Sequence, residues 1–327
     1  MRHAVFVLLV SISVLPVSMP AHAQDQAPSS RIEFLKYGSM ATTVAQSPDG
    51  RYLAIGARDV PGRGSRVVLW NRMTEERVRT MTFSANEAPR LAFDSSGTRL
   101  AVGPAERGGF IWSLQDDRST SPRSAAAPAN TLAFGLGGTL GIGEASGTGG
   151  AVRVWPNGPN NAPTVLETEG SVRSIALSES TSDLVLATGP TQVTLWNYRF
   201  NTTKQFDTFE GCPGELRQVG MVGGGEEFAD HFYVVTRRRA ECDPDYLCRI
   251  DAETRRVTDR IRRKNIRNVI PLGSERVAFS RGRYVYTFNL RTREERIVFQ
   301  SDNAVHDLSY GNGRLVVANS DVAVVEL

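Results

Sequence analysis

The sequence is poor in the side chains that most often build catalytic and metal centres. Its 327 residues include only three cysteines and four histidines. His3 and His22 lie in the first 23 residues, which leaves His231 and His306 for the rest of the chain. With two imidazoles, Ser-His-Asp and Cys-His arrangements have few ways to form, and paired CxxC motifs for zinc are missing. We therefore expect no metal site and assign no catalytic residue.

Strong net charge and phosphate-binding loops are also missing. The formal net charge is +3, too small at this length to indicate a nucleic-acid-binding protein. No Walker A motif occurs, and the glycine run at 223–225 is followed by two glutamates, whose charge disfavours phosphate. We expect no nucleic-acid partner and no cofactor. A chain of this size buries roughly 75% of its unfolded surface, so its core needs no metal.

The first 23 residues are predicted to be an export signal. Arg2 supplies the positive start, Ala4–Val17 is apolar, and Ala21-His22-Ala23 offers the small residues that a signal peptidase accepts. The apolar run is about 14 residues, short of the roughly 20 that span a bilayer. We expect export to the bacterial periplasm or the medium, with no membrane span. Residues 24–30 are then a flexible leader, and residues 31–327 a single domain.

Export makes a disulfide possible among Cys212, Cys242 and Cys248. Two pairings fit the spacing: Cys242–Cys248, which closes a short loop, and Cys212–Cys242. Sequence does not decide between them, because disulfide geometry depends on Cα separations. The remaining alternative is three buried free thiols.

A repeated order of turn, apolar strand and second apolar strand runs through the chain. The first copy has the turn Ser47–Gly50, then Tyr52–Gly56, then Val67–Asn71. Copies start near residues 48, 95, 136, 180, 224, 274 and 312, about 43 residues apart, and the last three are weaker. No helical periodicity competes, so each copy predicts four short strands. A four-stranded sheet cannot bury both faces alone, and seven copies therefore predict an all-β, seven-bladed β-propeller.

The N-terminal segment is expected to close this ring. The last copy supplies three strands before Leu327, and Ile32–Tyr37 has no partner within the first copy. We predict that Ile32–Tyr37 forms the outer strand of the last blade.

These elements resemble the WD-repeat and YVTN-type seven-bladed propeller families over nearly all of residues 31–327. The matching parts are the Ser-Pro-Asp-Gly turn, the Leu53–Gly56 strand and the strand ending in Trp70. The Gly-His dipeptide of WD repeats is absent, and the residues after the four tryptophans are Asn71, Ser113, Pro156 and Asn197 rather than Asp. The Asp–His–Trp hydrogen-bond network of that family therefore cannot form. The resemblance implies the fold and leaves the function open.

Basic residues are unevenly distributed and almost all are arginine. Residues 211–300 contain 18 Lys+Arg against 13 Asp+Glu, whereas residues 24–210 contain 18 of each. Clusters occur at 237–239, 255–256 and 260–267. The planar guanidinium suits carboxylates and phosphates, so an acidic partner is one interpretation, and a solvated face is the other.

Aligning the first strand of each copy brings basic residues to one equivalent position. In four consecutive copies these residues are Arg173, Arg217, Arg267 and His306, and Arg90 lies one step along in the second copy. First strands line the channel of a propeller, so the alignment predicts a cationic crescent at one channel mouth. Such a crescent would hold an acidic peptide or small anion. The alternative is that each arginine pairs with a local Asp or Glu.

We therefore predict a monomeric, non-catalytic binding or scaffold module that recognises a protein or an acidic ligand through the propeller face and channel mouth. Rigid rings that display variable loops suit such a role. The alternative is a lactonase-like hydrolase acting at the channel mouth.

Overall fold

The computed structural model describes residues 29–32, 40–58, 64–84, 89–103, 109–122, 129–146, 149–156, 158–178, 180–206, 212–221, 231–237, 244–273 and 275–327. The predicted export signal lies outside these residues, as do Cys242 and the arginines at 238 and 239. Within the described part, the strands form seven four-stranded antiparallel sheets, and one 3-10 turn is the sole helical element. The predicted seven-bladed, all-β propeller is confirmed.

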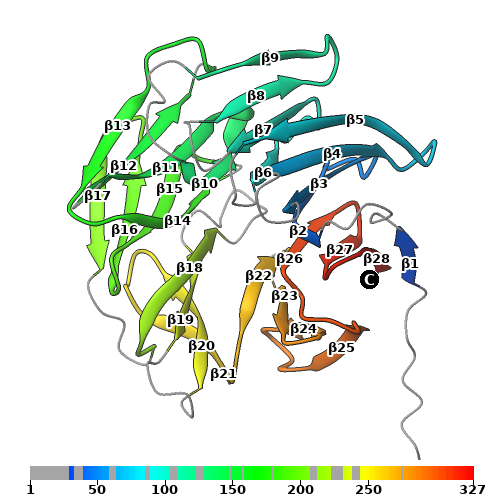
Figure 1. The fold of residues 1–327 in the computed structure, drawn as a ribbon. Coiled ribbons are helices and arrows are strands. Elements are labelled where there is room, and N and C mark those ends of the chain that lie inside the picture. Colours follow the sequence, from blue (N-terminus) through cyan, green and yellow to red (C-terminus); the bar gives the residue numbers. More distant parts are fainter. Residues whose placement is uncertain are drawn as a thin grey trace, which may run out of the picture.

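The first four blades follow the chain from the innermost strand to the outermost (Figure 1). Blade 1 contains β2 (Met40–Gln46), β3 (Tyr52–Arg58), β4 (Ser65–Asn71) and β5 (Glu76–Phe83). Blade 2 contains β6 (Arg90–Phe93), β7 (Arg99–Gly103), β8 (Phe110–Ser113) and β9 (Arg118–Thr120). Blade 3 contains β10 (Ala129–Phe134), the 3-10 turn η1 (Leu136–Gly138), β11 (Leu140–Ser146), β12 (Gly149–Trp155) and β13 (Thr164–Thr168). Blade 4 contains β14 (Val172–Leu177), β15 (Asp183–Thr188), β16 (Gln192–Asn197) and β17 (Thr202–Phe206).

The last three blades complete the ring. Blade 5 contains β18 (Glu215–Met221), β19 (His231–Arg237), β20 (Asp245–Asp251) and β21 (Val257–Arg263). Blade 6 contains β22 (Arg267–Pro271), β23 (Arg276–Arg281), β24 (Tyr284–Asn289) and β25 (Glu295–Gln300). Blade 7 contains β26 (Asp307–Gly311), β27 (Arg314–Ala318), β28 (Val322–Glu326) and β1 (Ser29–Ile32).

Strand β1 is the outermost strand of blade 7. It runs antiparallel to β28, with Ser29 opposite Val325 and Ile32 opposite Val322. The sequence predicts this place for Ile32–Tyr37, so the two segments share only Ile32. Residues 33–39 lie outside the described part of the chain.

Apolar side chains fill the interfaces between blades rather than one central core. Seven buried clusters are present, and each joins one face of a blade to the facing side of the next. The cluster between blades 1 and 7, for example, brings Leu53 and Ile55 against Val316 and Val324. Strands contribute to two clusters because successive side chains point to opposite faces. This explains why the middle strands are apolar at nearly every position.

Tight turns set the spacing of the strands. Gly50, at the end of the Ser-Pro-Asp-Gly turn, has a φ of +72°, a conformation that glycine adopts without a Cβ penalty. Asn312 and Gly313 join β26 to β27 with φ values of 49° and 71°. Two consecutive positive φ values are typical of a type I′ hairpin, whose twist matches that of the strands.

Two tryptophans have hydrogen-bond partners inside their own blade instead of a WD-type network. Trp112 Nε1 donates to Asp117 Oδ1 at 3.0 Å, and Trp196 Nε1 donates to Asn201 Oδ1 at 3.1 Å. Both acceptors lie five residues further on, with φ values of 55° and 53°. Asn197, at the position where WD repeats have Asp, accepts a backbone N–H of the same turn. The outer turn of the blade thus replaces the missing histidine and aspartate.

Candidate functional site

The innermost strands share an irregularity at one level of the ring. In blades 1, 3, 4 and 5, a β-bulge interrupts the pairing of the first strand, and the residues left over are Thr42, Asn130, Arg173 and Arg217. In blade 6 the pairing shifts directly after Arg267. A bulge leaves one residue outside the ladder and redirects its side chain.

The structure places the four predicted crescent residues at matching positions of blades 4 to 7. Arg173, Arg217, Arg267 and His306 each stand two residues before a buried apolar residue of the strand, namely Ile175, Val219, Val269 and Leu308. Arg173, Arg217 and Arg267 lie on β14, β18 and β22, and His306 directly precedes β26. These four strands are consecutive around the axis (Figure 1). The three arginines are exposed and His306 is half-buried. We call these four residues the crescent.

Local carboxylates neutralise part of the crescent. The charge of Arg267 acts on the Asp245 carboxyl group and opposes the rise in its pKa that burial causes. Among the described residues, Arg217 is its one arginine with an ion pair, 3.5 Å from Glu215 Oε2. Arg173 Nη1 donates instead to Leu216 O of the next blade at 3.3 Å. Pairing of every arginine with a neighbouring acid, the alternative from sequence, is therefore not what the geometry shows.

Arg90 occupies the neighbouring level, as the sequence alignment predicts. At this level each of the seven blades has a polar side chain that hydrogen-bonds to the backbone of the following blade. We call these residues the inter-blade belt, and they are Thr43, Arg90, Thr131, Ser174, Gln218, Asn268 and Asp307.

The bonds of the inter-blade belt range from 2.7 Å at Gln218 to 3.4 Å at Thr131 and Asn268. Thr43 Oγ1 donates to Pro89 O at 2.9 Å, and Arg90 Nε donates to Asn130 O at 3.1 Å. Gln218 makes two bonds to Val269, donating to its oxygen at 2.7 Å and accepting its N–H at 3.0 Å. Each such bond contributes about 1 kcal/mol net. The belt therefore contributes a hydrogen bond to each of the seven interfaces between blades, one residue from the level of the crescent.

Asp307 closes the belt between the last blade and the first. Its Oδ2 accepts the N–H of Val44 at 3.0 Å, and its Oδ1 accepts the N–H of Leu308 at 2.9 Å. Burial raises the pKa of Asp307 to about 6, although both hydrogen bonds and the charge of Arg90 act in the opposite direction. A group that titrates near neutral pH thus lies beside the crescent.

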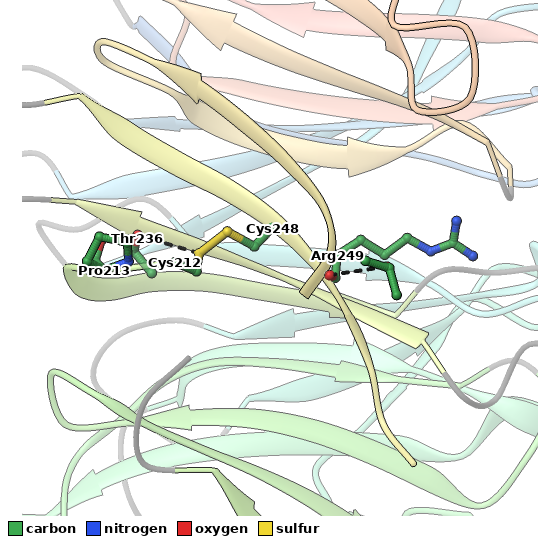
Figure 2. Close-up of a disulfide and its surroundings, with 6 residues drawn as sticks. Cys212, Pro213, Thr236, Cys248 and Arg249 are labelled. Carbon is green, nitrogen blue, oxygen red and sulfur yellow. Dashed lines mark hydrogen bonds between the residues drawn. A yellow bond between two sulfur atoms is a disulfide. The ribbon is translucent and has the colours of Figure 1, made fainter. Parts of the chain in front are cut away.

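Cys212 and Cys248 form a disulfide within blade 5, with Cα atoms 6.3 Å apart (Figure 2). Both pairings predicted from spacing, Cys242–Cys248 and Cys212–Cys242, are wrong, and so is the alternative of three free thiols. The physical reason is that the segment before β18 lies next to the middle of β20, so cysteines 36 residues apart meet in one apolar cluster. Both are buried, and Cys242 lies outside the described residues.

Metal-binding geometry is not found in the part of the chain that the structure describes. No three His, Cys, Asp or Glu side chains in these residues are grouped as ligands. His231 lies beside Asp251, with Nε2 at 3.7 Å from Oδ2, at the start of β19 rather than on the channel wall. In the same residues, no helix has the length and apolarity to cross a membrane.

The inter-blade belt and the Trp-turn bonds are the features that reasoning from sequence missed. The belt does leave a signal, because a polar residue stands at the same offset in all seven first strands. The role of these polar residues cannot be read from one blade alone, because the backbone of the neighbouring blade supplies their hydrogen-bond partners. The Trp-turn bonds have a clearer local signal, an Asp or Asn five residues after Trp112 and Trp196.

Comparison with known proteins agrees with this architecture. A structure of U3-55K has a TM-score of 0.69 at 15% identity, covering 91% of this chain and 98% of that one. The RRP9 WD40 repeats give 0.69 at 17%, covering 92% and 99%. The Myceliophteria thermophila Cps50 (Swd1) β-propeller domain gives 0.68 at 13%, covering 92% and 100%. No family model and no curated protein matches by sequence. The chain therefore has the seven-bladed β-propeller fold of the WD40-repeat proteins.

Proposed function

We propose that this protein is an exported, non-catalytic binding module that recognises an acidic segment of a protein partner at its channel mouth. The observation that carries the proposal is the crescent. Three exposed arginines and one histidine occupy one level on four consecutive blades, and Arg217 alone among them has a carboxylate at ion-pair distance within the described residues. Guanidinium groups bind carboxylates through two parallel hydrogen bonds, which favours an acidic partner.

The inter-blade belt supports a binding role because it holds the crescent rigidly. The belt lies one residue from the crescent in blades 4 to 7, where its members are Ser174, Gln218, Asn268 and Asp307. Arg173 is itself fixed by its bond to Leu216 O. A preorganised surface loses less conformational entropy when it binds, so more of the contact energy appears as affinity.

Export is part of the same proposal and rests on two independent features. The first is the pattern of residues 1–23, with its positive start, apolar middle and Ala21-His22-Ala23 end. The second is the Cys212–Cys248 disulfide, since disulfides persist in oxidising compartments such as the periplasm and are rare in the cytosol.

The binding role is tested by removing the crescent. The variant Arg173→Ala/Arg217→Ala/Arg267→Ala is compared with wild type in quantitative capture from the native cell envelope, and loss of an acidic partner is expected. The matched control, Arg118→Ala/Arg276→Ala/Arg296→Ala, removes the same charge from exposed positions on other strands. Equal capture by the crescent variant would overturn the proposal, and so would an equal loss in the control.

Export is tested by sequencing the N-terminus of the protein recovered from the periplasmic fraction and the medium. The expected terminus is Gln24, which follows the Ala21-His22-Ala23 site. Recovery of the uncleaved chain in the cytoplasm alone would contradict this part of the proposal.

A further inference from the structure

A cleft opens at the outer edge of the ring, between blades 1 and 2 (Figure 1). Its volume is about 420 Å³, within the range of about 300–1,000 Å³ that is typical of ligand sites. None of its described lining residues belongs to the crescent or to the inter-blade belt. We call it the outer cleft, and its lining includes Arg79, Phe83, Phe110, Trp112, Asp117 and Ser119.

The strand registers place these side chains on two surfaces that face each other. On β5, Arg79 pairs with Leu69, which belongs to the apolar cluster between blades 1 and 2. Phe83 lies four residues further along β5, on the same side, and packs against this cluster. In blade 2, Trp112 belongs to the same cluster and pairs with Ser119. The two walls of the outer cleft therefore present their side chains to one shared space.

The outer cleft is open because the outermost strand of blade 2 is short. Strand β9 has three residues and ends at Thr120, opposite Ile111, whereas β5 of blade 1 has eight. No residue of β9 lies opposite Phe110, and there the rings of Phe83 and Phe110 meet with their centroids 5.8 Å apart. Both side chains are half-buried. Part of each ring is therefore accessible to a ligand.

A polar group stands at the other end of the outer cleft. Asp117 Oδ1 accepts hydrogen bonds from Arg79 and from Trp112 Nε1, the latter at 3.0 Å. The Arg79 guanidinium lies over the Trp112 ring, 5.3 Å from its centroid. Both charged side chains remain accessible, with 44% of Arg79 and 66% of Asp117 exposed. A guanidinium has five N–H donors and a carboxylate accepts about four hydrogen bonds, so both retain capacity for a ligand.

The charge and the polarity of the outer cleft indicate the class of ligand. Arg79 and Asp117 are the charged residues of its described lining, and they form an ion pair, which favours a neutral ligand. Ser119 and Ser121 add exposed hydroxyl groups that both donate and accept. A sugar ring matches both ends of the cleft. Its C–H groups pack against the negative face of an aromatic ring, and its hydroxyl groups donate and accept hydrogen bonds.

We propose that the outer cleft binds a neutral oligosaccharide. One sugar ring packs against Phe83 and Phe110, and hydroxyl groups bond to Arg79, Asp117 and Ser119. This site goes beyond the proposed function, because it takes a neutral ligand on blades 1 and 2, whereas the crescent lies on blades 4 to 7. It is also independent of export.

The test is isothermal titration calorimetry of the full-length mature protein with maltohexaose, cellohexaose, chitohexaose and mannohexaose. Wild type is expected to bind at least one of them. The variant Arg79→Ala/Ser119→Ala should bind it about ten-fold more weakly, which corresponds to about 1.4 kcal/mol, because hydrogen-bonding groups are lost from the polar end. The matched control, Thr80→Ala/Arg118→Ala, removes one guanidinium and one hydroxyl from exposed positions next to these residues on the opposite sides of β5 and β9. It should bind like wild type.

A second variant tests the aromatic end of the outer cleft. Phe83→Leu keeps an apolar side chain but lacks the ring, and it should bind the oligosaccharide about five-fold more weakly.

Three results would overturn the proposal. They are no binding of any of the four oligosaccharides by wild type, an equal loss in the control and in Arg79→Ala/Ser119→Ala, and tighter binding at the cleft of a peptide of alternating Leu and Ser. The crescent variant should bind the oligosaccharide unchanged, so failure here and failure of the channel-mouth proposal give different results.

Discussion

Asp307 gives the most direct test of the inter-blade belt, because its charge and its hydrogen bonds can be removed separately. Burial raises its pKa from 3.8 to about 6. A difference of this size corresponds to about 3 kcal/mol between the charged and neutral forms. The folded protein holds this proton more tightly than the unfolded chain. Its contribution to stability is therefore fully present below about pH 3.8 and is lost as pH rises through about 6.

The variant Asp307→Asn is neutral at every pH and lacks this dependence. We expect the free energy of unfolding of wild type, minus that of Asp307→Asn, to fall by about 2–3 kcal/mol between pH 4 and pH 7.5. Other titrating groups are common to both proteins and cancel in the difference. Urea denaturation at fixed ionic strength and several pH values measures it.

Asp307→Ala separates the hydrogen bond from the charge. It leaves the N–H of Val44, a residue only 4% exposed, without its acceptor. We expect it to be less stable than Asp307→Asn by about 1–3 kcal/mol across the same pH range. A difference between wild type and Asp307→Asn that stays constant or increases with pH would refute the reasoning about the charge. Equal stability of the two variants would refute the role of the Val44 bond.

Three further perturbations test other parts of the ring. Deleting residues 24–38 removes β1 and uncovers the edge of β28, so the melting temperature should fall by about 5 °C or more. An unchanged melting temperature would contradict closure of the ring by this segment. Cys212→Ala/Cys248→Ala opens a loop whose ends are 36 residues apart, so the free energy of unfolding should fall by about 4 kcal/mol. Reduction of the wild-type disulfide should lower the free energy of unfolding by a similar amount. If neither change lowers it, the bond is absent or does not constrain the unfolded chain. Asn201→Ala removes the acceptor of Trp196 Nε1 at a residue with a φ of 53°, and the free energy of unfolding should fall by about 2–3 kcal/mol. Asn201→Gly also removes the acceptor but adopts this φ without strain, so the fall should be smaller. Equal falls for the two variants would show that the backbone conformation contributes nothing.

The fold could be predicted from sequence because each blade carries its own local signals. The Ser47–Gly50 turn, the apolar strand after it and the Trp-ended strand recur often enough to fix both the number of sheets and the strands in each. The equivalence of Arg173 and Arg217 could also be predicted, since it depends only on aligning the first strands of two blades, and both residues occupy matching bulges in the structure.

Contacts between parts of the chain could not be predicted in the same way. The disulfide is an example, because Cys212 and Cys248 are 36 residues apart and meet only once the blade has folded. The inter-blade belt is another, since the partner of Gln218 is the backbone of Val269 in the next blade.

The one-residue offset between the crescent and the inter-blade belt has a consequence for how such a ring can change. Bulged positions such as Thr42, Asn130, Arg173 and Arg217 are excluded from strand pairing, whereas their neighbours hold the blades together. Mutations at the bulges can therefore alter what the channel mouth attracts while the assembly of the ring is preserved. Four separately mutable sites of this kind make the mouth a natural place to graft new specificities, one blade at a time.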